Sequence, residues 1–218
     1  MIFKRKKRIA NKGWDDITIA KHKKILDLYD RYKDEEDKTF LQYELVGIVY
    51  DIDEDTLNSM KISEANEYVN GLRFLAHKPR PKMAKAHYTL NGHRYKTTFN
   101  FQQLTTSQYI DFQQIAPNAS TMPAEFLACI LIPEGKTYNK DYVIDDVISD
   151  IENYMTLEDC LGLTAFFLTL LRLLMRRSVR MLRRMVSKAE REGMMTSEQL
   201  DALRRTITLI ESGGGLKG

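Results

Sequence analysis

The sequence predicts an α+β protein that is predominantly α-helical, with one β-hairpin and a long C-terminal helix followed by a shorter helix. Three observations carry this prediction. Residues 156–192 form a stretch of helical composition without proline. Apolar residues recur at three- and four-residue spacing in several shorter segments. Asn91-Gly92, flanked by β-forming residues, is the clearest turn signal for paired strands.

Residues 156–192 carry the signals of one continuous helix. Thr156 precedes Asp159 by three residues, which resembles a capping box with a carboxylate in the first turn. The only glycine of the stretch is Gly162, and Gly193 follows it as an end signal. Such a helix would extend roughly 55 Å at about 1.5 Å per residue.

The first half of this helix is apolar on all sides. No residue from 160 to 171 is charged, but this run of about 12 residues is shorter than the roughly 20 of a membrane span. A helix that is apolar all round favours a buried position in a core. Contact with a partner or a second copy, and insertion into a membrane, are the alternatives.

The second half is basic, with a narrow apolar stripe opposite the charges. Steps of three and four place most of the cations on one side. The cations are Arg172, Arg176, Arg177, Arg180, Arg183, Arg184, Lys188 and Arg191, and the stripe is Val179, Leu182, Met185, Val186 and Ala189. Because arginine suits carboxylate and phosphate groups, an acidic protein surface is the favoured partner. Plain solvation, nucleic acid and anionic lipid are the alternatives.

Charge is distributed unevenly along the chain, although the net charge is only +3. Residues 1–12 and residues 172–192 each carry +6, so the remainder carries −9. Neutralisation within the protein or between subunits is the simplest use of this pattern. Binding of a polyanion is the alternative, and its candidate residues at the N-terminus are Lys4, Arg5, Lys6, Lys7 and Arg8.

Composition divides the chain into five parts. They are a basic N-terminal arm (1–12), a helical module (13–76), a linker rich in proline and basic residues (77–87), a hairpin with a second helical module (88–211), and a flexible tail (212–218). Pro79 and Pro81 exclude a continuous helix in the linker.

Helix signals recur in both modules. In the first we expect helices after Thr18, from Phe40 and over residues 63–75, with a solvated acidic turn over residues 51–55. In the second, strands at 86–90 and 93–99 are expected to pair, and helices are expected after Thr105, from Ala124 through Leu131, over residues 143–154 and after Thr196. Thr105 with Gln108 and Thr196 with Gln199 each form a capping box.

The two modules open with a similar pattern. Residues 14–18 and 101–105 both read aromatic, two polar residues, aliphatic and threonine, and a helix is expected after each. Generic helix-start chemistry explains this as well as duplication of one module does.

The motifs of common catalytic and metal sites are missing. There is no G-x-S-x-G, Walker loop, dinucleotide fingerprint or paired C-x-x-C. Asp51, Asp53 and Asp55 begin like a calcium loop, but Thr56 and Ile62 occupy its glycine and glutamate positions. We therefore expect no cofactor, no metal and no enzymatic activity.

Histidine and cysteine give no clear site either. His87 and His93 flank the hairpin turn and could approach each other, but they lack the spacing of a zinc site. Cys129 and Cys160 lie in apolar surroundings and are expected to be buried thiols, which fits a reducing, cytoplasmic setting. No signal or transmembrane segment is evident.

Residues 88–95 (YTLNGHRY) and 101–111 (FQQLTTSQYID) together resemble tail-assembly chaperones of tailed bacteriophages. In those proteins an Asn-Gly hairpin is followed by aromatic-x-x-Leu-Thr-x-x-Gln-aromatic and a helical body, and Trp14-Asp15-Asp16-Ile17-Thr18 looks like the opening of the same module. The resemblance covers roughly residues 13–170.

This resemblance implies a non-enzymatic protein of phage assembly, in the host cytoplasm or also in the virion. Its partners would be phage structural proteins or other copies of itself, and a membrane partner is not expected. The expected partner-binding residues come from the basic half of the long helix, which lies outside the resemblance; they are Arg176, Arg177, Arg180, Arg183, Arg184 and Arg191. The alternative is a virion adaptor that contacts nucleic acid through its basic helix and N-terminal arm.

Overall fold

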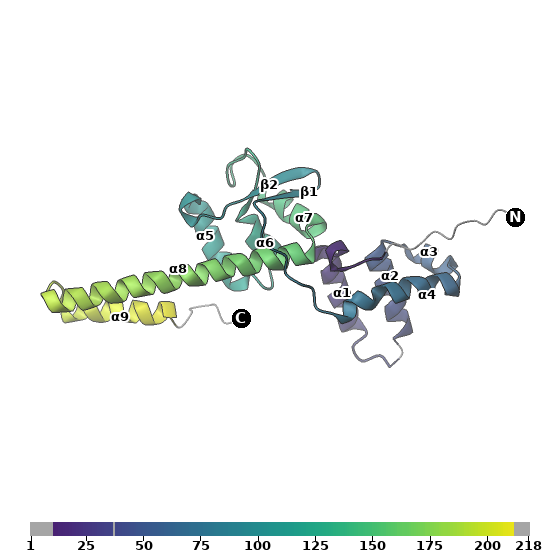
Figure 1. Cartoon of the computed structure of the whole chain (residues 1–218), viewed down its shortest axis with the longest axis horizontal. Coiled ribbons are helices and arrows are strands. Elements are labelled where there is room, and N and C mark those ends of the chain that lie inside the picture. The colour runs from purple at the N-terminus through teal and green to yellow at the C-terminus, as the bar shows by residue number, and fades with distance from the viewer. Residues whose placement is uncertain (1–10, 37, 212–218) are drawn as a thin grey trace.

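One long helix, α8 (Leu157–Glu192), runs along much of the molecule; the sheet and most other helices lie towards its N-terminal end, and one shorter helix lies along its second half (Figure 1). The computed structural model describes residues 11–36 and 38–211. Within this part the fold is α+β and mostly helical, as predicted, and α8 is followed by the shorter α9 (Ser197–Glu211).

The ends of α8 follow from local chemistry. The Thr156 hydroxyl accepts the N–H of Asp159 at 3.2 Å, which satisfies one of the free donors of the first turn. At the other end Gly193 takes a left-handed conformation with φ of 62°. Both signals were readable from the sequence, and no proline or π-bulge interrupts the helix between them.

The N-terminal module is a bundle of short helices with its own small core. Its elements are η1 (Trp14–Asp16), α1 (Ile19–Arg31), α2 (Thr39–Tyr50), α3 (Glu54–Ser59), α4 (Ile62–Gly71) and η2 (Leu72–Ala76). Ile25, Leu28, Leu45 and Val49 are buried together at its centre. The three expected helices are present. The expectation of a solvated acidic turn over residues 51–55 is wrong in part. Asp53 caps the additional helix α3, because its carboxylate accepts the N–H of Thr56 at 2.8 Å.

The sheet has three antiparallel strands, not the two expected. Strands β1 (His87–Leu90) and β2 (His93–Thr97) form the predicted hairpin, with φ of 50° at Asn91 and 76° at Gly92. Strand β3 (Leu131–Pro133) pairs with the other edge of β2. The helix predicted through Leu131 ends at Ala128, because residues 131–133 complete the sheet instead.

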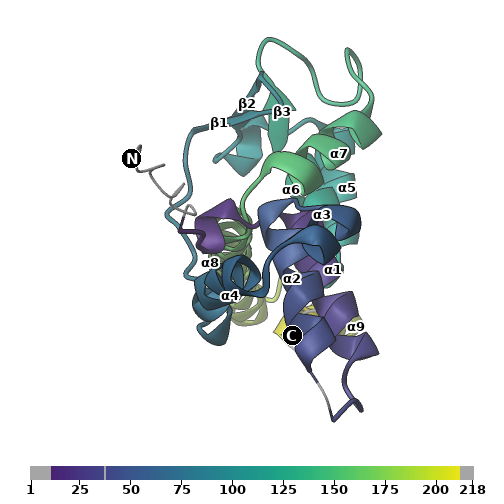
Figure 2. The ribbon, with the colours of Figure 1, turned by 90° about the vertical axis from the view of Figure 1, so that its right-hand side faces the viewer.

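The remaining elements surround the main core. They are η3 (Phe101–Gln103), α5 (Thr106–Ile115), η4 (Ala116–Asn118), α6 (Pro123–Ala128) and α7 (Ile144–Tyr154). Phe112, Phe126 and Phe167 meet inside, with the Phe112 and Phe126 ring centroids 5.0 Å apart. Figure 2, a view along the long axis, shows the sheet at the top and the N-terminal helices below it.

The similar openings of the two modules have the same local structure. A short 3-10 turn, an extended residue and a capping threonine precede α1 and α5 alike. The Thr18 hydroxyl accepts the N–H of Lys21, and the Thr105 hydroxyl accepts that of Gln108. Duplication of a whole module stays a prediction.

The linker 77–87 lies against the first turns of α8. The N–H of Lys82 donates to the Glu158 carbonyl at 2.9 Å, and the N–H of Arg80 donates to its carboxylate at 3.1 Å. The Lys85 ammonium pairs with Asp159 at 2.9 Å. These contacts hold the linker, which follows the N-terminal module in the chain, against the start of the long helix.

Candidate partner-binding surface

Past the main core, α8 extends away from the other elements and pairs with α9 alone (Figure 1). We call residues 176–208 the α8–α9 projection. Val179, Val186 and Ile207 are buried between the two helices, with Leu182, Leu200 and Leu203 packed against them. The Thr196–Gln199 capping box starts α9, since each residue accepts the backbone N–H of the other. The projection is thus an antiparallel helix pair with a small core.

The predicted arginines are on the surface of this projection. Arg176, Arg177, Arg180 and Arg184 are exposed, and none pairs with a carboxylate of the described residues. Arg191 is also exposed and donates to the carbonyl of Ser187 at 3.1 Å. Four guanidinium groups therefore face solvent with their donors unoccupied by the described part of the chain.

Arg183 differs from these four arginines. It is exposed too, but it has an interaction within the chain. Of the six residues predicted to bind a partner, Arg183 and Arg191 therefore have an interaction within the chain, whereas the other four have no carboxylate partner among the described residues.

Apolar side chains lie exposed beside these arginines. Met181 and Met185 are 63% and 54% exposed, and Leu173 and Phe166 follow them towards the body at 50% and 40%. Met185 was expected in the stripe that packs inward, and this expectation is wrong because α9 covers only the side of α8 that carries Val179 and Val186.

The first half of α8 is also covered on one side only. Cys160, Leu163, Phe167 and Leu171 face the main core, whereas Phe166 packs against Phe99 at the edge of the core and stays 40% exposed. The expectation of burial on all sides is therefore wrong for this half. The buried residues are spaced three or four apart, as on one face of a helix. This spacing was the sequence feature that could have indicated an uncovered opposite face of α8.

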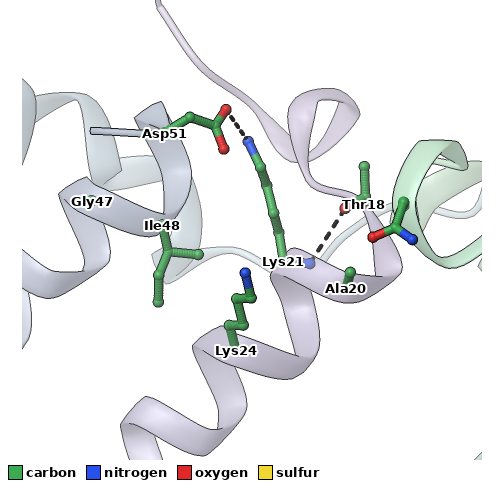
Figure 3. Close-up of a pocket in the computed structure, with 8 residues that line it drawn as sticks. Thr18, Ala20, Lys21, Lys24, Gly47, Ile48 and Asp51 are labelled. Atoms are coloured by element: carbon green, nitrogen blue, oxygen red, sulfur yellow. Dashed lines mark hydrogen bonds and ion pairs between the residues drawn. The ribbon is translucent and has the colours of Figure 1, made fainter. Parts of the chain in front are cut away.

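A pocket lies between α1 and α2, with Asn153 of α7 at its edge (Figure 3). It has a volume of about 390 Å³ and is lined by Thr18, Ala20, Lys21, Lys24, Gly47, Ile48, Asp51 and Asn153. The Lys21 ammonium and the Asp51 carboxylate form an ion pair at 2.6 Å across it. The lining contains no nucleophile with a neighbouring base, so the pocket has no recognisable catalytic arrangement.

The other candidate groups have structural surroundings. In the register of the β-hairpin His93 lies opposite Leu90 and His87 opposite Lys96, so the two histidines do not face each other. Burial raises the pKa of the Cys129 thiol to about 11 and that of Cys160 to about 12. Both thiols are unpaired and buried, as predicted. Thiols of such high pKa are poor nucleophiles near neutral pH.

Among residues 11–36 and 38–211, no group of three His, Cys, Asp or Glu side chains is placed to hold a metal ion. Within the same residues, no helix combines the length and the apolar character that a membrane crossing requires. Lys4, Arg5, Lys6, Lys7 and Arg8, the candidates for nucleic-acid contact, lie outside the described residues, as does the predicted tail 212–218.

Comparison with known proteins gives no relative: no protein-family model, no curated protein and no solved structure matches this chain.

Proposed function

We propose that this chain is a non-enzymatic assembly protein of a tailed bacteriophage, similar to a tail-assembly chaperone. It acts in the host cytoplasm and binds phage structural proteins or further copies of itself through the α8–α9 projection. The sequence pattern of residues 88–111 supports the phage assignment, and the projection supports the binding role. The proposed activity needs no cofactor.

The observation that carries the binding role is the composition of the exposed side of α8. Arg177 and Arg184 stand between Met181, Met185 and Leu173 on neighbouring helical turns, and all five side chains are exposed. Methionine and arginine are enriched in protein interfaces, where the apolar groups lose contact with water and the charges set the orientation.

The same composition favours a protein partner over nucleic acid. A nucleic-acid backbone would engage the guanidinium groups but would leave Met181 and Met185 in water. An acidic protein surface with apolar side chains can satisfy both kinds of group at once. The projection is thus suited to a helix or groove that carries carboxylates around an apolar strip.

The alternative, a virion adaptor that contacts nucleic acid, is favoured by one observation. Arg176, Arg177, Arg180 and Arg184 are free of carboxylate partners among the described residues. This alternative predicts a gel shift with DNA at about 50 mM salt that weakens steeply as salt increases, because bound counterions are released. Absence of a shift at that salt concentration would remove it.

Reversal of three arginines tests the proposed function. Arg176→Glu, Arg180→Glu and Arg184→Glu together change the sign of the exposed side without touching Val179, Val186 or Ile207. We expect the tagged wild-type chain, purified from phage-producing cells, to carry phage structural proteins identifiable by mass spectrometry. The triple variant should lose them while its circular dichroism spectrum stays native.

A matched control changes the same number of charges elsewhere. The control variant carries Lys96→Glu, Lys136→Glu and Lys140→Glu. These three lysines are exposed on the sheet and on the β3–α7 loop. This control should retain the partners. Equal recovery of partners by both variants, or recovery of no phage protein by the wild type, would contradict the proposed role.

A further inference from the structure

Charge is separated along the long axis of the molecule. The N-terminal module, residues 13–76, holds 8 Lys and Arg against 15 Asp and Glu, a net charge of −7. The α8–α9 projection holds 9 Lys and Arg against 4 Asp and Glu, a net charge of +5. Figure 1 shows the two at opposite ends, with the sheet and α5–α7 between them.

The acidic end has exposed carboxylates that no cation of the described residues neutralises. Glu54, Asp55 and Glu64 on α3 and α4 are exposed, and none forms an ion pair within the described residues. Ile62, at the start of α4, is 74% exposed. This end therefore combines an exposed apolar side chain with carboxylates that have no ion-pair partner among the described residues, and its charge is opposite to that of the projection.

The two surfaces cannot meet within one chain. Helix α8 is continuous from Leu157 to Glu192, so its basic half points away from the module that contacts its first turns. Among the described residues, the carboxylates of Glu54, Asp55 and Glu64 and the guanidinium groups of Arg176, Arg180 and Arg184 therefore have no ion-pair partner within the chain and are available for contacts between molecules.

We propose that the α8–α9 projection of one copy docks onto the α3–α4 end of a second copy, head to tail. The proposal rests on the proposed function, since it names the partner of the same surface. Arg176, Arg180 and Arg184 would face Glu54, Asp55 and Glu64, while Met181 and Met185 cover Ile62. A head-to-tail contact uses two different surfaces, so each copy keeps one free, and repetition gives a ring or an open filament.

Sedimentation velocity on the purified full-length protein tests this directly. At about 50 mM salt the mean mass should rise with protein concentration, and at about 500 mM salt the protein should be monomeric, because salt screens exposed charges. A single monomeric species across the concentration range at low salt would overturn the proposal. Association that disappears after nuclease treatment would do the same, since nucleic acid would then be the link.

A pair of variants makes the test specific. One carries Arg176→Glu, Arg180→Glu and Arg184→Glu, and the other carries Glu54→Lys, Asp55→Lys and Glu64→Lys. Each should be monomeric alone at low salt. An equimolar mixture should associate again, because the native projection of one variant meets the native acidic end of the other.

The body control Lys96→Glu, Lys136→Glu, Lys140→Glu should assemble like the wild type. Self-association that survives reversal of the acidic end, or a mixture that stays monomeric, would refute the head-to-tail contact. Failure of this proposal can be told apart from failure of the proposed function. If the purified protein is always monomeric but the projection variant still loses its phage partners, the binding role stands and only the head-to-tail contact is refuted.

Discussion

Gly162 lies in the second turn of α8, where the linker crosses the helix. A Cβ built on this glycine would lie 1.7 Å from the carbonyl oxygen of Lys82 and 2.7 Å from its carbon. Both are backbone atoms, and the N–H of Lys82 is bonded to the Glu158 carbonyl in the preceding turn. The glycine is therefore required by the close approach of two backbone segments.

Replacing Gly162 by alanine should destabilise the protein. At an uncrowded helix position glycine to alanine stabilises by roughly 1 kcal/mol. Here we expect a loss of about 1–3 kcal/mol, as for other overpacked sites. Urea unfolding followed by circular dichroism measures the change.

Ser178→Ala is the matched control, because Ser178 is exposed on the same helix. It should change the free energy of unfolding by no more than about 0.5 kcal/mol. A Gly162→Ala variant that is more stable than the wild type would show that the linker does not hold its position against α8.

At the scale of single residues, the sequence predicts features that depend on a few neighbouring residues, but it does not predict features that depend on tertiary packing. Thr156, Thr105 and Asn91-Gly92 take the predicted roles because a cap or a turn depends on a few neighbouring residues. The sequence marks Gly162 as the only glycine of the helix, but the reason for it lies 80 residues upstream, in the linker. Met185 was misplaced for the same reason, since its exposure depends on where α9 packs.

The α8–α9 projection depends on few buried side chains. Val179, Val186 and Ile207 form its centre, separate from both cores of the rest of the molecule. A helix pair with so small a core should open more easily than the body.

Val186→Asp should therefore release α9 without unfolding the rest. A carboxylate between the two helices has no partner there and is costly to bury. Hydrogen exchange followed by mass spectrometry should show loss of protection in residues 197–208, with residues 101–171 unchanged.

Met185→Asp, on the exposed side of the same helix, is the control and should leave the exchange of α9 as in the wild type. Uniform loss of protection along the chain in Val186→Asp would instead mean that the projection and the body unfold as one unit.

Long elements were predictable and short ones were not. Helix α8 has caps at both ends and a helical composition between them, so its identity needed no tertiary information. Strand β3 has three residues within an apolar run that suits a helix equally well, and only the free edge of β2 selects the strand. Helix α3 has six residues, and its capping Asp53 could be read equally as part of a solvated turn.

At the scale of the whole molecule, the sequence revealed the charge runs but not their separation in space. Residues 172–192 are visibly basic, and the acidic excess of the remainder follows from the net charge. The basic and the acidic segments occupy opposite ends because α8 is one continuous helix that extends away from the N-terminal module (Figure 1). The exposed apolar side chains of the projection could not be identified either, since apolar residues on a helix are more often buried.

Site-specific photo-crosslinking from the α8–α9 projection tests the central claim most directly. A photoreactive amino acid replaces Met181, which is 63% exposed, and in a control it replaces Met83, which is 86% exposed on the linker. Illumination of phage-producing cells should give crosslinks from position 181 to a phage structural protein or a second copy of the chain, and few from position 83. Equal yields at both positions, or no crosslink to another polypeptide from position 181, would contradict the claim that this projection is a docking surface.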